Sequence, residues 1–125
     1  MDIDQTLQEA IRHQQRGERQ NAEKLYRTIL VKESRHSDAN HNLGIILKQG
    51  GQLESALEFF KIALEINPNQ GQFWVSYIDC LIHLKQFSAA GTILKQGQSR
   101  GLKGSVVDQL LLRLKSTQDD RDRKS

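Results

Sequence analysis

Apolar residues recur along this chain at the three- and four-residue spacing of an amphipathic helix. Two such stripes, at 43–47 and 53–64, flank the polar segment 49–52. That segment reads Gln-Gly-Gly-Gln, a composition in which a helix ends readily and the chain reverses. The only proline, Pro68, follows the second stripe and closes it. The pattern predicts a helical hairpin over residues 37–70.

The hairpin is repeated along the chain. When the sequence is shifted against itself by 34 residues, residues of the same kind coincide. The coinciding sets are Ala22, Ala56 and Ala90; Tyr26, Phe60 and Leu94; Ile29, Ala63 and Gly97; Gly17, Gly51 and Lys85; and Ala10, Gly44 and Ile78. Three copies follow, at 3–36, 37–70 and 71–104, and the prediction is an all-α protein.

Small residues recur where the two helices of a hairpin must approach closely. In the middle copy these are Gly44 and Ala56, and Phe60 fills the space that remains. The flanking copies depart from this pattern, since Ile78 stands in place of Gly44 and Leu102 in place of the proline. Departures at the ends are expected of a stacked array, because a terminal unit has a neighbour on one side only.

The middle copy resembles a tetratricopeptide repeat, whose pattern is an aromatic, Leu-Gly, a second aromatic, Ala-x-x-x-Phe and a closing Pro. Six of the eight signature positions match in kind, namely Leu43, Gly44, Ala56, Phe60, Ala63 and Pro68. Asn40 and the aliphatic Leu47 stand at the two aromatic positions. The resemblance implies a right-handed superhelical stack of three hairpins. In such a stack the first helix of each hairpin lines a concave groove.

The last part of the chain departs from the repeat. A further apolar stripe predicts a seventh, capping helix at 105–116 that covers the third hairpin; it consists of Val106, Val107, Leu110, Leu111 and Leu114. The alternative is an amphipathic segment that docks on a partner. Residues 117–125 are charged and contain no apolar residue, so we expect a disordered tail or the start of a linker.

By resemblance, the groove carries aliphatic, amide and charged side chains from the first helix of each copy. These are Leu7, Ile11, Gln14, His41, Asn42, Ile45, Lys48, Gln49, Gln72, Val75, Ser76, Asp79 and His83. Amides pair with an extended backbone, and Ile45 or Val75 can accept an apolar side chain, so the expected partner is a peptide or a partner helix. Alternatively, Leu7 and Ile11 pack inside their own hairpin.

One subfamily grips the C-terminal carboxylate of heat-shock chaperones through Lys and Asn on the first inner helix, Asn on the second, and Lys and Arg on the third. The residues that correspond here are Leu7, Ile11, Asn42, Gln72 and Ser76, of which only Asn42 matches. A carboxylate would therefore meet no cation from this set. The sequence argues against a chaperone-tail partner.

Composition and motifs exclude other classes. The net charge of the 125 residues is only +3 and is scattered, which argues against nucleic acid. No apolar run is long enough to span a membrane, and a single cysteine, Cys80, with an acidic and polar start predicts a cytoplasmic protein. We expect no cofactor and no enzyme, because no phosphate loop, nucleophile elbow or zinc motif occurs. A metal site on His41 and His83 would need a third ligand, with Asp79 as the candidate.

The prediction is therefore a non-enzymatic scaffold that binds a protein or peptide partner. The stretch Gln14–Gly17 followed by Ala22–Leu30 resembles bacterial repeat segments that precede glycosyltransferase, sulfotransferase or oxygenase domains. The alternative is accordingly the substrate-presenting helper module of a multidomain transferase. Homo-oligomeric assembly stays open, because an incomplete superhelix leaves apolar end surfaces.

Overall fold

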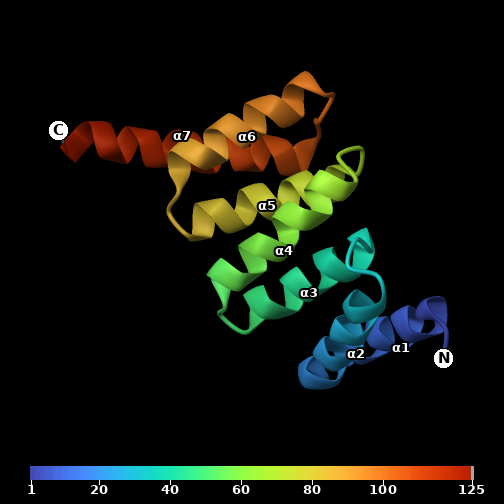
Figure 1. The fold of residues 1–125 in the computed structure, drawn as a ribbon. Helices are drawn as coiled ribbons and strands as arrows, with labels where there is room; N and C mark the ends of the chain where they lie inside the picture. Colours follow the sequence, from blue (N-terminus) through green and yellow to red (C-terminus); the bar gives the residue numbers. More distant parts are fainter. Residues whose placement is uncertain (125) are drawn as a thin grey trace.

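The computed structural model describes the backbone of residues 1–124 and the side chains of residues 1–117, and residues 1–124 form seven helices without a strand. The helices are α1 (Ile3–Gln15), α2 (Arg19–Lys32), α3 (Ser37–Gln49), α4 (Leu53–Ile66), α5 (Gly71–His83), α6 (Phe87–Ser99) and α7 (Ser105–Lys124). Consecutive helices pair as hairpins α1–α2, α3–α4 and α5–α6, and the hairpins are stacked one on the next (Figure 1). The predicted all-α repeat stack is confirmed.

The three hairpin turns share one backbone conformation. The second residue after each first helix has a positive φ: 77° at Gly17, 82° at Gly51 and 61° at Lys85. The next N–H bonds back across the turn, from Glu18 to His13, from Gln52 to Leu47 and from Gln86 to Leu81, each at 2.9 Å. This is the Schellman ending of a helix, which favours glycine at the left-handed position. The glycines at this position therefore serve the chain reversal predicted from the sequence.

In the turns that join successive hairpins, a side chain at the same position of the repeat donates a hydrogen bond to a backbone carbonyl of the turn. Asn40 donates to the carbonyl of Ser34 at 3.1 Å. One repeat later, the indole Nε1–H of Trp74 donates to the carbonyl of Pro68 at 2.7 Å. Both donors are buried, and each satisfies a carbonyl that the turn would otherwise leave without a partner. Different residue types thus perform one task in equivalent places.

The core lies between paired helices and between neighbouring hairpins. Gly44 faces the ring of Phe60 so closely that a Cβ built on Gly44 would lie 2.6 Å from Phe60 Cε1. Ala56 is fully buried, and Phe60 is 1% exposed. The predicted roles of these three residues, close approach and filling, are confirmed. Because the sites of Gly44 and Ala56 are tightly packed, a larger side chain at either one must displace a neighbour.

Helix α7 packs on α5 and α6 and caps the third hairpin. Its backbone stays helical to Lys124, past residue 116, where the sequence analysis placed the start of a disordered tail. The charged segment contains neither glycine nor proline to stop the helix. The side chains after residue 117, and Ser125 altogether, lie outside the described part. Val107 and Leu110 are buried as predicted, whereas Leu111 is 40% exposed.

None of the helices in the described part of the chain is both long enough and apolar enough to cross a membrane.

Candidate functional site: a groove between α3, α5 and α7

A groove of about 480 Å³ runs between helices α3, α5 and α7. Apolar, amide and charged side chains line it together. Its lining is Ile45, Lys48, Gln49, Phe60, Gln72, Val75, Ser76, Asp79, Val106, Gln109, Leu110 and Arg113. We call this set the α3–α5–α7 groove. Seven of the predicted groove residues belong to it, all from α3 and α5.

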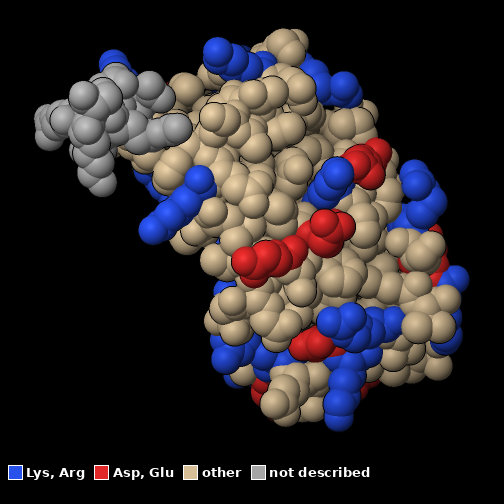
Figure 2. Space-filling view, turned by 60° about the vertical axis from the view of Figure 1, so that its left-hand side comes forward, with Lys and Arg blue, Asp and Glu red and all other residues tan. Residues whose placement is uncertain are grey.

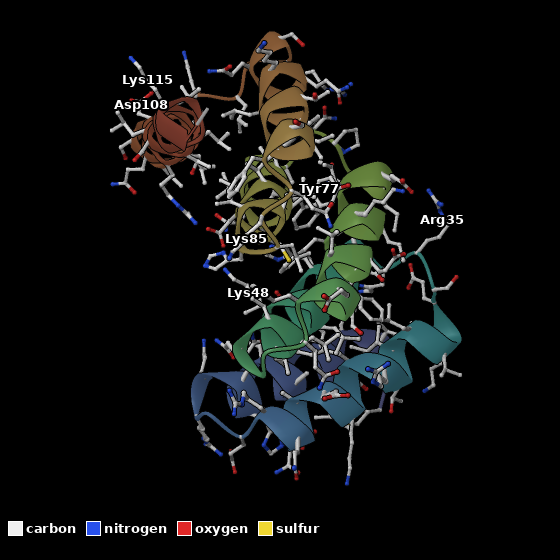
Figure 3. All side chains as sticks on the ribbon, turned by 90° about the vertical axis from the view of Figure 1, so that its left-hand side faces the viewer. Arg35, Lys48, Tyr77, Lys85, Asp108 and Lys115 are labelled. Carbon is white, nitrogen blue, oxygen red and sulfur yellow. The ribbon has the colours of Figure 1, made fainter. Side chains whose placement is uncertain are left out.

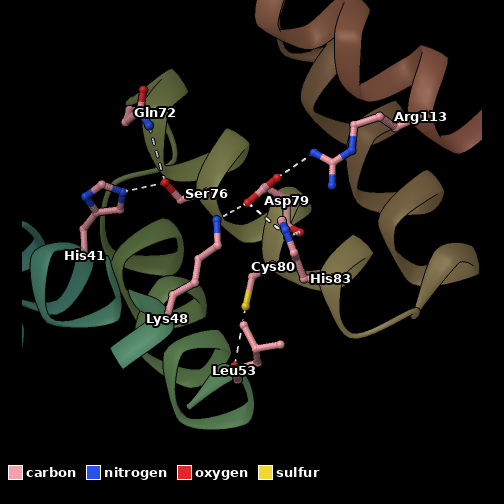
Figure 4. Close-up of polar contacts among 9 residues, drawn as sticks. All are labelled: His41, Lys48, Leu53, Gln72, Ser76, Asp79, Cys80, His83 and Arg113. Atoms are coloured by element: carbon pink, nitrogen blue, oxygen red, sulfur yellow. Dashed lines mark hydrogen bonds and ion pairs between the residues drawn. The ribbon is translucent and has the colours of Figure 1, made fainter. Parts of the chain in front are cut away.

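Asp79 is the electrostatic centre of the groove (Figure 4). Its carboxylate accepts a hydrogen bond from Lys48 Nζ on α3 and another, at 2.7 Å, from Arg113 Nη1 on α7. His83 Nδ1 lies 3.4 Å from the same carboxylate. Burial acts to raise the pKa of Asp79, but the hydrogen bonds from Lys48 and Arg113, together with the charges of Lys48 and His83, outweigh it and hold the pKa below its usual 3.8. The carboxylate is thus ionised at neutral pH and joins three helices.

Asp79 pairs with both cations of the groove. Lys48 and Arg113 are the charged donors of this groove, and each donates one hydrogen bond to the same carboxylate. A ligand carboxylate would share these cations with Asp79. The groove thus offers charged, amide and apolar contacts side by side.

His41 was predicted to line the groove, but the structure places it in the core. It is 5% exposed, and its ring packs against Phe73 with 4.7 Å between ring centroids. Its Nε2 lies 2.7 Å from Ser76 Oγ, a contact that joins α3 to α5 (Figure 4). Burial lowers the pKa of His41 below 6.5, against smaller opposing effects of Asn42 and Asp38. His41 is a packing residue, since a buried imidazole favours its neutral form.

The predicted residues of the first copy also lie away from the α3–α5–α7 groove. Leu7 and Ile11 are half-buried and pack against the core of the first two hairpins, in agreement with the alternative that they pack within their own hairpin. Gln14 Oε1 accepts a hydrogen bond from the phenol of Tyr26, which belongs to α2. Burial raises the pKa of that phenol to about 12. These side chains serve the first hairpin.

The remaining predicted residues, Asn42 and His83, belong to α3 and α5 but do not line the groove. Asn42 is half-buried and His83 is exposed. His83 Nδ1 lies 2.9 Å from the backbone oxygen of Asp79, and His41 is turned toward Ser76. Among the described residues, no three His, Cys, Asp or Glu side chains gather as a metal ion would require.

Four groove residues come from α7 and were missed by the sequence analysis. They are Val106, Gln109, Leu110 and Arg113. The signal was present in the 34-residue register, which places them one repeat after Gln72, Val75, Ser76 and Asp79. Helix α7 takes the place of the first helix of a fourth hairpin. Neither of its two interpretations, a cap or a segment that docks on a partner, included a contribution to the groove.

Neither the cysteine nor the surface charge adds a second site. Cys80 is fully buried, and its thiol lies 3.5 Å from the carbonyl of Leu53. Burial raises the pKa of Cys80 to about 11, so the thiol stays protonated at neutral pH. On the face shown in Figure 2, blue and red side chains are interspersed among uncharged ones. This face carries no continuous basic surface of the kind that tracks a phosphate backbone.

A stack of 34-residue helical hairpins with a groove formed by their first helices defines a helical-repeat protein. The tetratricopeptide repeat family model matches residues 47–114, more than half of the chain. The chain belongs to the tetratricopeptide repeat family. No curated protein matches its sequence.

Several solved structures share the fold. The Sgt2 tetratricopeptide domain from Aspergillus fumigatus has a TM-score of 0.85 and 18% identity, over 97% of this chain and 82% of that one. The first tetratricopeptide domain of Spaghetti (RPAP3), bound to an HSP90 peptide, has a TM-score of 0.85 and 8% identity. This match covers 94% of this chain and 93% of that one. The Yersinia enterocolitica type III secretion chaperone SycD, in complex with a YopD peptide, has a TM-score of 0.77 and 19% identity. This match covers 98% of this chain and 93% of that one. At these identities the likeness shows the fold.

Proposed function

We propose that this chain is a non-enzymatic interaction scaffold that holds an extended peptide segment of a partner protein in the α3–α5–α7 groove. The observation that carries the proposal is the lining of the groove, which combines aliphatic side chains with the amides of Gln49, Gln72 and Gln109. An extended peptide presents backbone donors and acceptors to such amides and places alternate side chains against apolar walls. Peptide-bound neighbours with this fold, SycD and RPAP3, support the proposal.

The chemistry of the groove narrows the class of peptide. Lys48 and Arg113 are both paired with Asp79, so a C-terminal carboxylate must compete with Asp79 for them. Val75 and Ile45 offer half-buried aliphatic surface from neighbouring helices. We therefore infer an internal segment with small or branched apolar side chains as the ligand, and not an acidic chaperone tail.

A binding measurement with matched variants tests the proposal. Linear peptides selected from a random display library against the whole chain supply a fluorescent probe. We expect Val75→Asp to weaken binding of that probe at least tenfold, because a charge in the groove wall must be desolvated when the peptide docks. Val31→Asp is the control: Val31 is 87% exposed on α2, away from the groove, and the same change there should leave affinity unaltered.

Circular dichroism of both variants separates lost binding from lost fold. Equal affinity of Val75→Asp and the unaltered chain would place the peptide elsewhere and contradict the groove assignment. The selection could instead yield only peptides that end in a free carboxylate and lose binding when this carboxylate is amidated. That result would contradict the proposed ligand class, an internal segment with apolar side chains. Affinity capture from native lysate then identifies the partner that carries the selected segment.

A further inference from the structure

Helix α7 exposes a stripe that the other first helices of the stack keep covered. The stripe consists of Asp108, Leu111, Leu112 and Lys115, spaced three or four residues apart, which places them on one face. All four are exposed, Leu111 at 40% and Leu112 at 66%. Figure 3 shows Asp108 and Lys115 on the side of α7 that points away from the rest of the molecule. We call these four residues the α7 stripe.

The 34-residue register shows what covers this face elsewhere. Leu112 corresponds to Gly44 and Ile78, and both are buried against the second helix of their own hairpin. Helix α7 has no such helix beside it in the described part of the chain. Two leucines thus lie in solvent at a position where the repeat normally buries apolar surface, and covering them is favourable by the hydrophobic effect.

The charges at the two ends of the stripe define the chemistry of the occupant. Lys115 stands where Leu47 and Leu81 are buried, and Asp108 stands where Asn40 and Trp74 are buried. An ordinary second helix of a hairpin would bury both charges without a counter-charge, which is costly. The occupant must instead present a cation near Asp108 and an anion near Lys115, with apolar residues between them.

A second α7 meets this requirement. The stripe is self-complementary when reversed, because Asp108 and Lys115 lie at equal distances on either side of the pair Leu111–Leu112. We propose that two copies of this chain associate through the α7 stripe, with the helices antiparallel about a two-fold axis between Leu111 and Leu112. Asp108 of each copy then faces Lys115 of the other, and the four leucines pack at the centre.

The proposed pairing leaves the α3–α5–α7 groove open. The groove residues of α7, such as Gln109 and Arg113, lie on a different face of the helix from the stripe. A parallel pairing would place like charges opposite each other, so the charges select the antiparallel one. The paired molecule presents two grooves, so that a partner with two binding segments gains from their combined effective concentration. The pairing itself does not depend on what the groove binds.

Light scattering over a concentration series tests the association. The mass of the unaltered chain should rise from the 14.3 kDa monomer toward twice that value. Leu112→Glu should raise the dissociation constant at least tenfold, because it places a charge at the centre of the interface; glutamate is a good helix former, so α7 is retained. Val31→Glu, an equally drastic change at an exposed apolar position of α2, should behave as the unaltered chain does.

Charge variants test the geometry. Asp108→Lys creates copies with two cations on the stripe, and Lys115→Asp creates copies with two anions, so each alone should stay monomeric. An equal mixture of the two should form a heterodimer, and the double variant Asp108→Lys/Lys115→Asp should regain self-association. Recovery on mixing also shows that both variants are folded.

A constant monomer mass at all concentrations would overturn the proposal. So would association that Leu112→Glu leaves unchanged, because the contact would then lie on another surface. A mixture of the two charge variants that stays monomeric would overturn the antiparallel pairing. Val75→Asp should still self-associate, so that failure of the groove proposal and failure of this one are told apart.

Discussion

At the scale of single residues, each position of the repeat has its own structural role. A residue type that departs from the repeat shows the free-energy cost of filling that role with another side chain. Lys85 is the clearest case. It takes a φ of 61° at a turn where Gly17 and Gly51 take the same region. A side chain in the left-handed region costs about 1–2 kcal/mol, which glycine avoids. The third hairpin therefore carries local backbone strain that the first two do not.

Replacing Lys85 by glycine should stabilise the chain. We expect Lys85→Gly to raise the free energy of unfolding by about 1 kcal/mol, since the relief of strain exceeds the added freedom of the unfolded chain. Urea denaturation followed by circular dichroism measures the change. The reverse substitution, Gly51→Lys, is the control and should lower stability by a similar amount. A lower midpoint for Lys85→Gly would show that the lysine side chain makes a favourable contact that outweighs its backbone.

The residue scale also shows where prediction from one sequence stops. The roles of Gly44 and Ala56 could be predicted, because a small residue at a fixed place in a helical stripe indicates a close contact between helices. The burial of His41 could not, because a histidine on the first helix is compatible with both a groove and a core position. Its contacts with Phe73 and Ser76 depend on how the second hairpin sits on the third. Only packing distinguishes the two positions.

At the scale of elements, helices pair because small side chains let their backbones approach. Ala56 on α4 is fully buried in the contact with α3, close to the pair Gly44–Phe60. Interiors of this density accept little added volume. The hairpin is therefore sensitive to side-chain size on the inner face of α4 and tolerant of it on the outer face.

Two leucine substitutions on α4 test that difference. Ala56→Leu should lower the free energy of unfolding by about 1–3 kcal/mol, because three added carbons must displace packed neighbours. Ser55→Leu, at the adjacent and exposed position, should change it by less than about 0.5 kcal/mol. Thermal melts of both variants compare them directly. An unaltered melting temperature for Ala56→Leu would contradict the close packing of α3 on α4.

At the scale of the whole molecule, Asp79 joins the second hairpin, the third hairpin and the cap. Lys48 reaches it from α3 and Arg113 from α7, while Asp79 itself lies on α5 with its side chain 16% exposed. This network holds α7 against the groove whose wall it completes. It also makes the docking of α7 dependent on pH, because the contacts need an ionised carboxylate.

The sign of that dependence follows from the lowered pKa of Asp79. The stabilisation is fully present above the unfolded pKa near 3.8 and is lost as the pH falls through the lower folded value. We expect Asp79→Asn to cost about 1 kcal/mol at neutral pH and to lose less stability than the unaltered chain on acidification. Denaturant titrations between pH 7 and pH 3 measure both effects.

A double-mutant cycle with Arg113→Ala attributes the effect to this network. Arg113→Ala should destabilise the unaltered chain more than it destabilises the Asp79→Asn variant, because the two residues share one contact. Additive effects of the two substitutions would show that the contact contributes nothing to the docking of α7.

The alternative function as a helper module of a transferase and the cytoplasmic location stay predictions from the sequence.

The sequence alone determined the class of fold, because a 34-residue period, paired helical stripes and small residues at fixed places are local properties of the chain. It also indicated all seven groove residues of α3 and α5, from Ile45 to Asp79, since one helix face follows from spacing. The tertiary structure decided which of these side chains are reachable. The enclosure of His41, the engagement of both cations by Asp79 and the contribution of Arg113 depend on distances between helices more than thirty residues apart, and such distances arise only when the hairpins stack.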